Sequence, residues 1–108
     1  MLHDDHRTSL RVARRRLIEA LRAGEYRHEA REALAEKNML AVGRVTPEEV
    51  VRLLRRCRGE QHGTSPHHAD RELVVHEFKP YASGRKWYVK AYFRGSTAWF
   101  ISVHPGEE

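Results

Sequence analysis

The first third of the chain repeats its apolar residues at helical spacing. From about Thr8 to Arg22 they recur every three or four positions, which predicts an amphipathic helix with Thr8 or Ser9 as its N-cap. Gly24 is well placed to stop this helix in a left-handed conformation. A second, narrower apolar side predicts another helix from about His28 to Lys37.

The third predicted helix has the clearest start in the chain. Thr46-Pro47-Glu48-Glu49 supplies a capping hydroxyl, a proline at the first helical position and a glutamate three residues after the cap. The apolar stripe that follows ends at Cys57, the single cysteine, which we expect to be a small buried hydrophobic residue. The stretch 59–69 has no periodicity and is expected to be a loop.

After residue 70 the apolar period changes to two. This predicts strands at 73–79, 86–93 and 97–104, with a turn at 80–84 and a tight hairpin at 94–96. Helices followed by a meander predict an α+β fold, in which N-terminal helices pack on one face of a C-terminal antiparallel sheet of three or slightly more strands. We expect one domain over 1–108, with residues 1–6 flexible, helices over about 8–58 and the sheet over 70–104.

Alternation gives each predicted strand two faces. In the middle strand one face is apolar and is expected to meet the helices, namely Trp87, Val89, Ala91 and Phe93. The other face alternates cations with aromatic rings, namely Lys86, Tyr88, Lys90 and Tyr92. The last strand divides into Ala98, Phe100, Ser102 and His104 on one side and Trp99, Ile101 and Val103 on the other. Because His104 is polar, we expect its side of the strand to be the one that faces away from the helices.

Charge narrows the class of partner. With 20 Lys and Arg against 15 Asp and Glu, the chain carries a net charge of +5, which favours polyanions. Between Glu77 and Glu107 there is no acid, whereas five bases occur, namely Lys79, Arg85, Lys86, Lys90 and Arg94. This favours RNA contact by the sheet over the alternative, in which the lysines only protect a strand edge from aggregation. The arginine-rich helix faces fit a solvated surface, or one that tracks phosphates or binds a partner.

The sequence argues against membrane and secretion classes. It has no apolar run near the ~20 residues that span a bilayer, and residues 1–6 lack a secretion leader, so a soluble cytoplasmic protein is expected. No metal or other cofactor is expected. A zinc site from His62, His67 and His68 is disfavoured because adjacent side chains rarely converge and Cys57 has no second cysteine.

Three other histidines suggest acid–base chemistry. His62, His76 and His104 lie in the loop, the first strand and the last strand, and a three-stranded sheet could bring them together around Tyr88 and Lys90. Because histidine titrates near neutral pH, such a set is a candidate catalytic site.

The order of these parts resembles the MqsR-type (motility quorum-sensing regulator) toxins, within the RelE-like group of bacterial messenger-RNA endoribonucleases. The residues that carry the resemblance span about 17–104 and include Leu21-Arg22-Ala23-Gly24-Glu25-Tyr26, the capped helix from Thr46, Phe78-Lys79-Pro80, Tyr88-Val89-Lys90 and Phe100-Ile101-Ser102-Val103-His104.

The resemblance implies a RelE-like fold and a metal-independent ribonuclease. The 2′-hydroxyl of the RNA would attack the adjacent phosphate and leave a 2′,3′-cyclic phosphate and a 5′-hydroxyl. Tyr88 falls on the tyrosine of the family's strand and His104 on its terminal cation. The family has a lysine before its first strand, where this chain offers His62, and a glutamine in that strand, where His76 is the nearest polar substitute. Lys90 or Arg85 would stabilise the charge of the transition state.

The same resemblance implies partners: messenger RNA, free or on the ribosome, and a cognate antitoxin. Two other hypotheses remain beside the toxin endoribonuclease. One is a non-catalytic RNA-binding or ribosome-associated module that uses the same sheet. The other is a protein-interaction domain whose arginine-rich helices dock an acidic partner.

Overall fold

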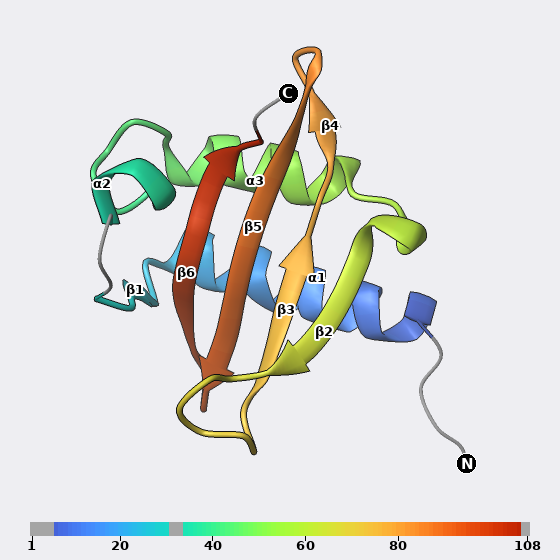
Figure 1. Cartoon of the computed structure of the whole chain (residues 1–108), viewed down its shortest axis with the longest axis vertical. Helices are drawn as coiled ribbons and strands as arrows, with labels where there is room; N and C mark the ends of the chain where they lie inside the picture. The colour runs from blue at the N-terminus through green and yellow to red at the C-terminus, as the bar shows by residue number, and fades with distance from the viewer. Residues whose placement is uncertain (1–5, 31–33, 107–108) are drawn as a thin grey trace.

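Two long helices lie against one face of a twisted sheet (Figure 1). The computed structural model describes residues 6–30 and 34–106. Its helices are α1 (His6–Ala23), α2 (Leu34–Lys37) and α3 (Pro47–Arg56), with a 3₁₀ turn η1 (Gly59–Gln61). Its strands are β1 (Tyr26–His28), β2 (His62–Pro66), β3 (Val74–Phe78), β4 (Tyr81–Ala82), β5 (Arg85–Arg94) and β6 (Thr97–Pro105). The predicted α+β class, with helices on one face of a C-terminal sheet, is confirmed.

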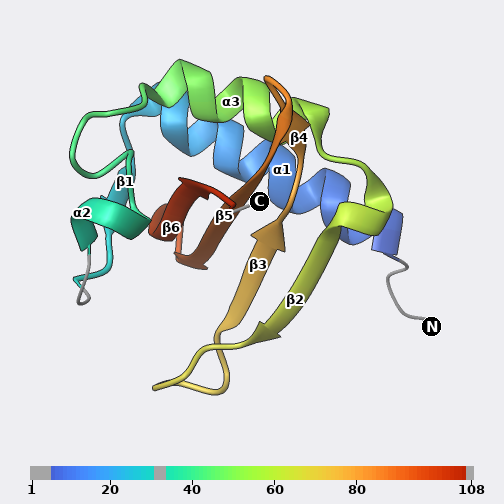
Figure 2. The ribbon, with the colours of Figure 1, turned by 45° about the horizontal axis from the view of Figure 1, so that its top comes forward.

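The sheet is larger than three strands. Its order is β1-β6-β5-β3-β2, and β4 pairs with β5 beyond the end of β3. The pairs among β2, β3, β5 and β6 are antiparallel, whereas β1 runs parallel to β6. The β2–β3 end of the sheet reaches away from the two helices (Figure 2). In this strand order the long β5 lies in the middle of the sheet, where it can position side chains on both faces.

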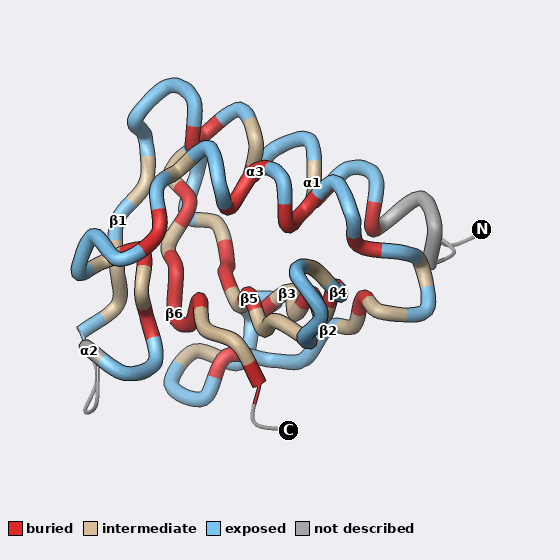
Figure 3. The backbone as a smooth tube through the Cα atoms, turned by 90° about the horizontal axis from the view of Figure 1, so that it is seen from above, coloured by how far each residue is buried: buried red, intermediate tan, exposed pale blue. Residues whose placement is uncertain are grey.

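One apolar core lies between the helices and the sheet. Buried residues line the inward sides of α1, α3 and the central strands (Figure 3). On α1 they recur at helical spacing, namely Leu10, Ala13, Leu17, Ala20 and Leu21. They meet fully buried residues of β5 and β6, among them Val89, Phe100 and Val103. Among the residues that the structure describes, no helix covers the opposite face of the sheet.

Local signals in the sequence mark the start of α3 and the end of α1. Thr46 caps α3: its Oγ1 accepts a hydrogen bond from the Glu49 backbone N–H, and the Glu49 carboxylate accepts one from the Thr46 N–H. Gly24 ends α1 with φ +74°, as predicted. The N-cap prediction at Thr8 or Ser9 is wrong, because α1 begins at His6. The flexibility expected of residues 1–5 lies outside the described residues.

Two predicted segments differ from the structure for non-local reasons. Of the helix predicted at about 28–37, the structure describes the part Leu34–Lys37, whereas His28 ends the strand β1, which pairs with Ala98–Phe100 of β6. Within the predicted loop, His62–Pro66 forms β2 although it contains Gly63 and Pro66, which are depleted in strands. It pairs in full register with Val74–Phe78, and this partner is invisible to local periodicity.

The last strand contains an irregularity that sets which side chains face outward. Lys90 of β5 is opposite Ser102, whereas its neighbour Ala91 is opposite Phe100, so β6 has one extra residue, Ile101. Phe100 and Val103 consequently both enter the core. The predicted strict alternation along β6 is wrong, and the extra residue lets His104 point away from the helices.

Candidate functional site

His62 and His76 lie together on the helix side of the sheet. His62 Nε2 is 3.2 Å from His76 Nδ1, and the two rings stack with their centroids 5.4 Å apart. Their other ring neighbours, Phe78 and Phe93, belong to the core or pack against it. The register of β3 places His76 opposite the buried Ala91, which fixes this side.

The same surroundings set the charge of His76. Burial lowers the pKa of His76, and the positive charge of Arg16 lowers it further. The Arg16 guanidinium lies 3.8 Å from the Phe93 ring centroid, so it covers the same corner of the core. A neutral His76 is suited to share one hydrogen with His62. The pair thereby joins β2 to β3 beneath α1.

Tyr88 and His104 stack on the opposite face of the sheet. They are directly paired on β5 and β6, with ring centroids 5.5 Å apart and planes at 30°. Each is next to a core valine, Val89 or Val103, so their side chains point away from the helices. We call this side, with Lys86, Tyr88, Lys90, Ser102 and His104, the open face. The expectation that His62 and His76 join His104 around Tyr88 is therefore wrong, because alternation sends the first two to the helices.

The backbone fixes the tautomer of His104. Its Nδ1 is 2.9 Å from the Pro105 carbonyl oxygen, which can only accept a hydrogen bond. In the neutral imidazole this nitrogen carries the hydrogen, and Nε2 keeps a lone pair. A half-exposed imidazole with a free lone pair on Nε2 is what general base catalysis needs.

An acid that the sequence analysis missed shares the open face. Lys90 is opposite Ser102 on β6 and opposite Glu77 on β3. Glu77 Oε1 lies 3.9 Å from the ammonium of Lys79. The residues from 78 to 106 are free of acids in sequence, but in space Glu77 partly offsets Lys79 and Lys90. The sequence did contain a signal for this, because neighbouring residues of a strand alternate and Glu77 must lie on the opposite face from His76.

The predicted RNA-binding residues are divided in the same way. Lys86 lies on the open face, with its Nζ 5.8 Å from the ring centroid of Tyr81. Arg85 is exposed at the start of β5. It is two residues before Trp87 and therefore shares the face of Trp87, opposite the open face. Lys79, Lys86 and Lys90 are therefore the predicted cations that lie with Tyr88 and His104.

Tyr92 lies on the open side of β5 but is covered. It is 2 % exposed and belongs to a second, smaller apolar cluster with Val75 and Ile101. His67, from the segment after β2, packs edge-on against the Tyr92 ring at 4.8 Å. The prediction that Tyr92 offers its ring to RNA is therefore wrong, because this segment folds over that end of the sheet.

A hydrogen-bonded cluster holds that segment in place. Glu29 Oε2 is 2.8 Å from His67 Nε2 and 3.2 Å from the Tyr92 hydroxyl. Ligand atoms of Glu29, His67 and His68 lie within 4.8 Å of one another, so the adjacent histidines do converge. However, His67 Nδ1 accepts the backbone N–H groups of Ala69 and Asp70, which leaves the ring hydrogen on Nε2, facing Glu29.

That tautomer is unsuited to a metal ion. A cation on His67 Nε2 would require its hydrogen to move to Nδ1, where two backbone N–H groups already point. The donor set therefore fits a hydrogen-bonded clasp, in which His67 donates to Glu29 and the Tyr92 hydroxyl donates to the same carboxylate oxygen.

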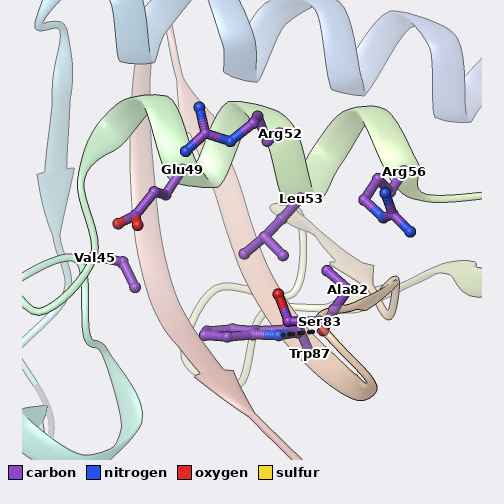
Figure 4. Close-up of a pocket in the computed structure, with 8 residues that line it drawn as sticks. All are labelled: Val45, Glu49, Arg52, Leu53, Arg56, Ala82, Ser83 and Trp87. Carbon is purple, nitrogen blue, oxygen red and sulfur yellow. Dashed lines mark hydrogen bonds between the residues drawn. The ribbon is translucent and has the colours of Figure 1, made fainter.

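A groove of about 260 Å³ opens on the other side of β5, between α3 and the β4–β5 turn (Figure 4). Trp87 lies flat across it, and its Nε1–H donates to the Ala82 carbonyl oxygen at 3.3 Å. The guanidinium groups of Arg52 and Arg56 stand over it from α3, whereas the carboxylate of Glu49 is engaged by the N-cap of that helix. The groove offers an apolar floor and cations, and its described lining pairs no general base with a nucleophile.

Within the described part of the chain, no helix has both the length and the apolar character needed to cross a bilayer. Comparison of the chain with protein-family models, curated proteins and solved structures finds no match.

Proposed function

We propose that the protein is an endoribonuclease that uses the open face of the sheet. The observation that carries this proposal is the Tyr88–His104 stack, in which the Pro105 carbonyl leaves His104 Nε2 as a proton acceptor. A hydroxyl, a base and the ammonium of Lys90 on one exposed face supply the groups that RNA cleavage by its own 2′-hydroxyl requires. Placement among RelE-like toxins of the MqsR type is part of the same proposal.

The chemistry assigns a role to each group. His104 Nε2 takes the proton of the 2′-hydroxyl as O2′ forms a bond to the adjacent phosphorus. The bond from phosphorus to O5′ breaks, and the Tyr88 hydroxyl gives its proton to the departing oxygen. Lys90 stabilises the negative charge on the phosphoryl oxygens. The products are a 2′,3′-cyclic phosphate and a 5′-hydroxyl, and proton exchange with solvent returns Tyr88 and His104 to their starting states.

His62 and His76 have no place in this mechanism. They lie on the helix side of the sheet, and His62 is 4 % exposed. Of the three histidines predicted to be catalytic, His104 is the one on the open face, so in this proposal it acts as the base and the tyrosine beside it as the acid.

In this proposal the biological role is that of a toxin, which inhibits translation and growth by cutting messenger RNA. A cognate antitoxin would silence it by binding the basic protein. Growth arrest on expression of the wild-type chain, relieved by loss of His104, is the cellular test of this role.

The biochemical test is cleavage in the presence of EDTA. Purified protein should cut single-stranded RNA and leave 2′,3′-cyclic phosphate ends, which a phosphatase can remove only after acid or a cyclic phosphodiesterase has opened the ring. His104→Gln should abolish cleavage while His76→Gln retains it. Intact RNA after incubation with the wild-type protein, both as free RNA and on translating ribosomes, would instead support the non-catalytic RNA-binding module.

An arginine-lined hollow on the helices supports the alternative hypothesis of a protein-interaction domain. A surface hollow between α1 and α3 is lined by four arginines, one acid and one isoleucine, namely Arg11, Arg14, Arg15, Arg55, Glu19 and Ile18. It lies on the helical layer, away from the open face. If the protein were only an acidic-partner domain, RNA binding would be absent even at low salt.

A further inference from the structure

Tyr81 presents an exposed ring at the end of the open face. β4 pairs Tyr81 with Lys86, and since directly opposed residues share a face, the ring stands on the side of Lys86 and Tyr88. Its partner position on β4, Ala82, packs instead against the core. Tyr81 is 56 % exposed, the highest value among the exposed large hydrophobic residues of the described chain.

The backbone beneath this ring is held firmly. The Arg56 Nε–H donates to the Tyr81 carbonyl oxygen at 2.9 Å, which ties β4 to the end of α3. The preceding Pro80 is buried, and its carbonyl accepts the Trp87 backbone N–H at 2.8 Å. An exposed ring on a fixed backbone loses little conformational entropy when a ligand stacks on it.

Cations lie on more than one side of Tyr81. The Lys86 ammonium is 5.8 Å from the ring centroid. A shallow hollow of about 390 Å³ adjoins the ring and is lined by Arg56, Arg58, Gln61 and Tyr81. Arg58 Nε is 3.5 Å from a carboxylate oxygen of Glu60, but both side chains are about three-quarters exposed, and such pairs are weak in water. The Arg58 guanidinium therefore remains able to meet a phosphate.

We propose that Tyr81, Lys86 and Arg58 form a subsite for one nucleotide of single-stranded RNA, next to Tyr88 and His104. The base stacks on Tyr81, and the phosphates on either side of that nucleotide contact Lys86 and Arg58. Rings that stack on bases, flanked by cations, are how proteins hold single strands. Lys86 and Tyr88 are two residues apart on β5, which is about 7 Å along a strand, a distance that one nucleotide can bridge.

The subsite rests on the proposed function in that the bound strand continues to Tyr88 and His104. The subsite can nevertheless be tested separately from the proposed function, because RNA binding can be measured without cleavage. A suitable probe is a fluorescently labelled single-stranded RNA of mixed sequence, titrated by anisotropy in EDTA with the His104→Gln variant as the background.

In this background Tyr81→Ala should weaken RNA binding by about 5- to 100-fold, the range that loss of one base–aromatic stack gives. Tyr81→Phe keeps the ring and should bind within about twofold. Arg58→Gln should lower the slope of log Kd against log salt by about 0.7, the value for one phosphate contact on a single strand. Arg27→Gln is the matched charge control, because Arg27 is exposed on β1 at the opposite edge of the sheet.

A set of RNAs that each lack one base tests the stacking itself. For the RNA whose missing base is the one that stacks on Tyr81, the additional effect of Tyr81→Ala should disappear. If Tyr81→Ala binds every RNA as tightly as the background and melts at the same temperature, the subsite is wrong, and the exposed ring belongs to a protein contact instead.

The outcomes separate the two proposals. Binding that depends on Tyr81 without cleavage by the wild-type protein would overturn the proposed function and leave the subsite. Cleavage by the wild-type protein, with an affinity and a KM that Tyr81→Ala leaves unchanged, would overturn the subsite and leave the proposed function. A failure of the wild-type protein to bind any RNA would overturn both.

Discussion

Gly106 lies directly against the ring of Tyr88. A methyl group at this glycine would stand 2.7 Å from Tyr88 Cε2, closer than carbon atoms normally approach. The Gly106 backbone N–H also donates to the Lys86 carbonyl oxygen at 2.7 Å, so the backbone cannot easily move away. The residue after β6 thus limits where the Tyr88 ring can lie.

We predict that Gly106→Ala lowers the rate of RNA cleavage by about 10- to 100-fold. The added methyl must displace the Tyr88 ring from its position on His104, and misplacement of a reacting group by about 1 Å can cost a factor of this size. The measurement is the single-turnover rate on a short RNA. Gly63→Ala is the matched control, since a methyl there meets nothing within 4 Å. Equal rates for the two variants would show that this contact does not position Tyr88.

We predict that Tyr88→Phe and His104→Gln each lower the cleavage rate by about 10²- to 10⁴-fold, the usual contribution of a general acid or base. Their melting temperatures should change little, because both side chains are half exposed. The kinetic assay should be paired with a thermal melt. His76→Gln provides the contrast: it perturbs a histidine on the helix side and should retain most of the activity. A loss of activity with His76→Gln at unchanged stability would contradict the assignment to the open face.

We predict that the protein loses stability as the pH falls below about 6.5, in part through His76. Burial, and secondarily Arg16, lowers the pKa of His76 below its ordinary 6.5 in the folded protein. As the pH falls, the unfolded chain therefore binds a proton that the folded chain resists, so the free energy of unfolding decreases. Burial lowers the pKa of His28 as well, so it contributes in the same direction.

Urea unfolding at pH 7.5, 6.5 and 5.5 measures this effect. His76→Gln should flatten the dependence, and a variant that also carries His28→Gln should flatten it further. The same slope in the wild-type protein and in both variants would show that other groups control acid stability.

We predict that Arg14→Met destabilises the fold by about 1–3 kcal/mol, whereas Arg15→Met changes the free energy of unfolding by less than about 0.5 kcal/mol. Arg14 Nη1 donates to the carbonyl oxygens of Leu54 and Cys57, at 3.3 and 2.9 Å, and so joins α1 to the end of α3. Arg15 is exposed on the same helix. Chemical denaturation of the two variants gives the comparison. Similar values for both would mean that solvent replaces the Arg14 hydrogen bonds.

Local patterns in the sequence predicted the parts of the fold that depend on neighbouring residues. Thr46 and Glu49 are three residues apart, so the N-cap of α3 could be predicted without knowledge of any tertiary contact. The core face of β5 follows from alternation alone. β1 and β2 could not be predicted in this way, because each becomes a strand only by pairing with a distant segment.

The candidate site shows the same limit. Tyr88 was placed correctly because β5 is regular, and His104 pointed outward as expected, although for a different reason. The face of His62 and His76 depends on the pairing of β3 with β5, in which His76 lies opposite Ala91, and the sequence of β3 alone does not contain this register. Burial of Tyr92 depends on Glu29 and His67, which are 63 and 25 positions before it, and no short-range pattern relates them.

The extra residue at Ile101 has a consequence for how this chain can change its length. Insertions and deletions are normally absorbed in exposed turns, where they leave the packed strands in phase. Deletion of Ile101 itself would remove this extra residue and keep the pairs on both sides of it, so Val103 would still face the core and His104 the open face. The cost of this deletion is the contact of Ile101 with Val75 and Tyr92, so β6 should accept one residue fewer here with a loss of stability but without a change of face.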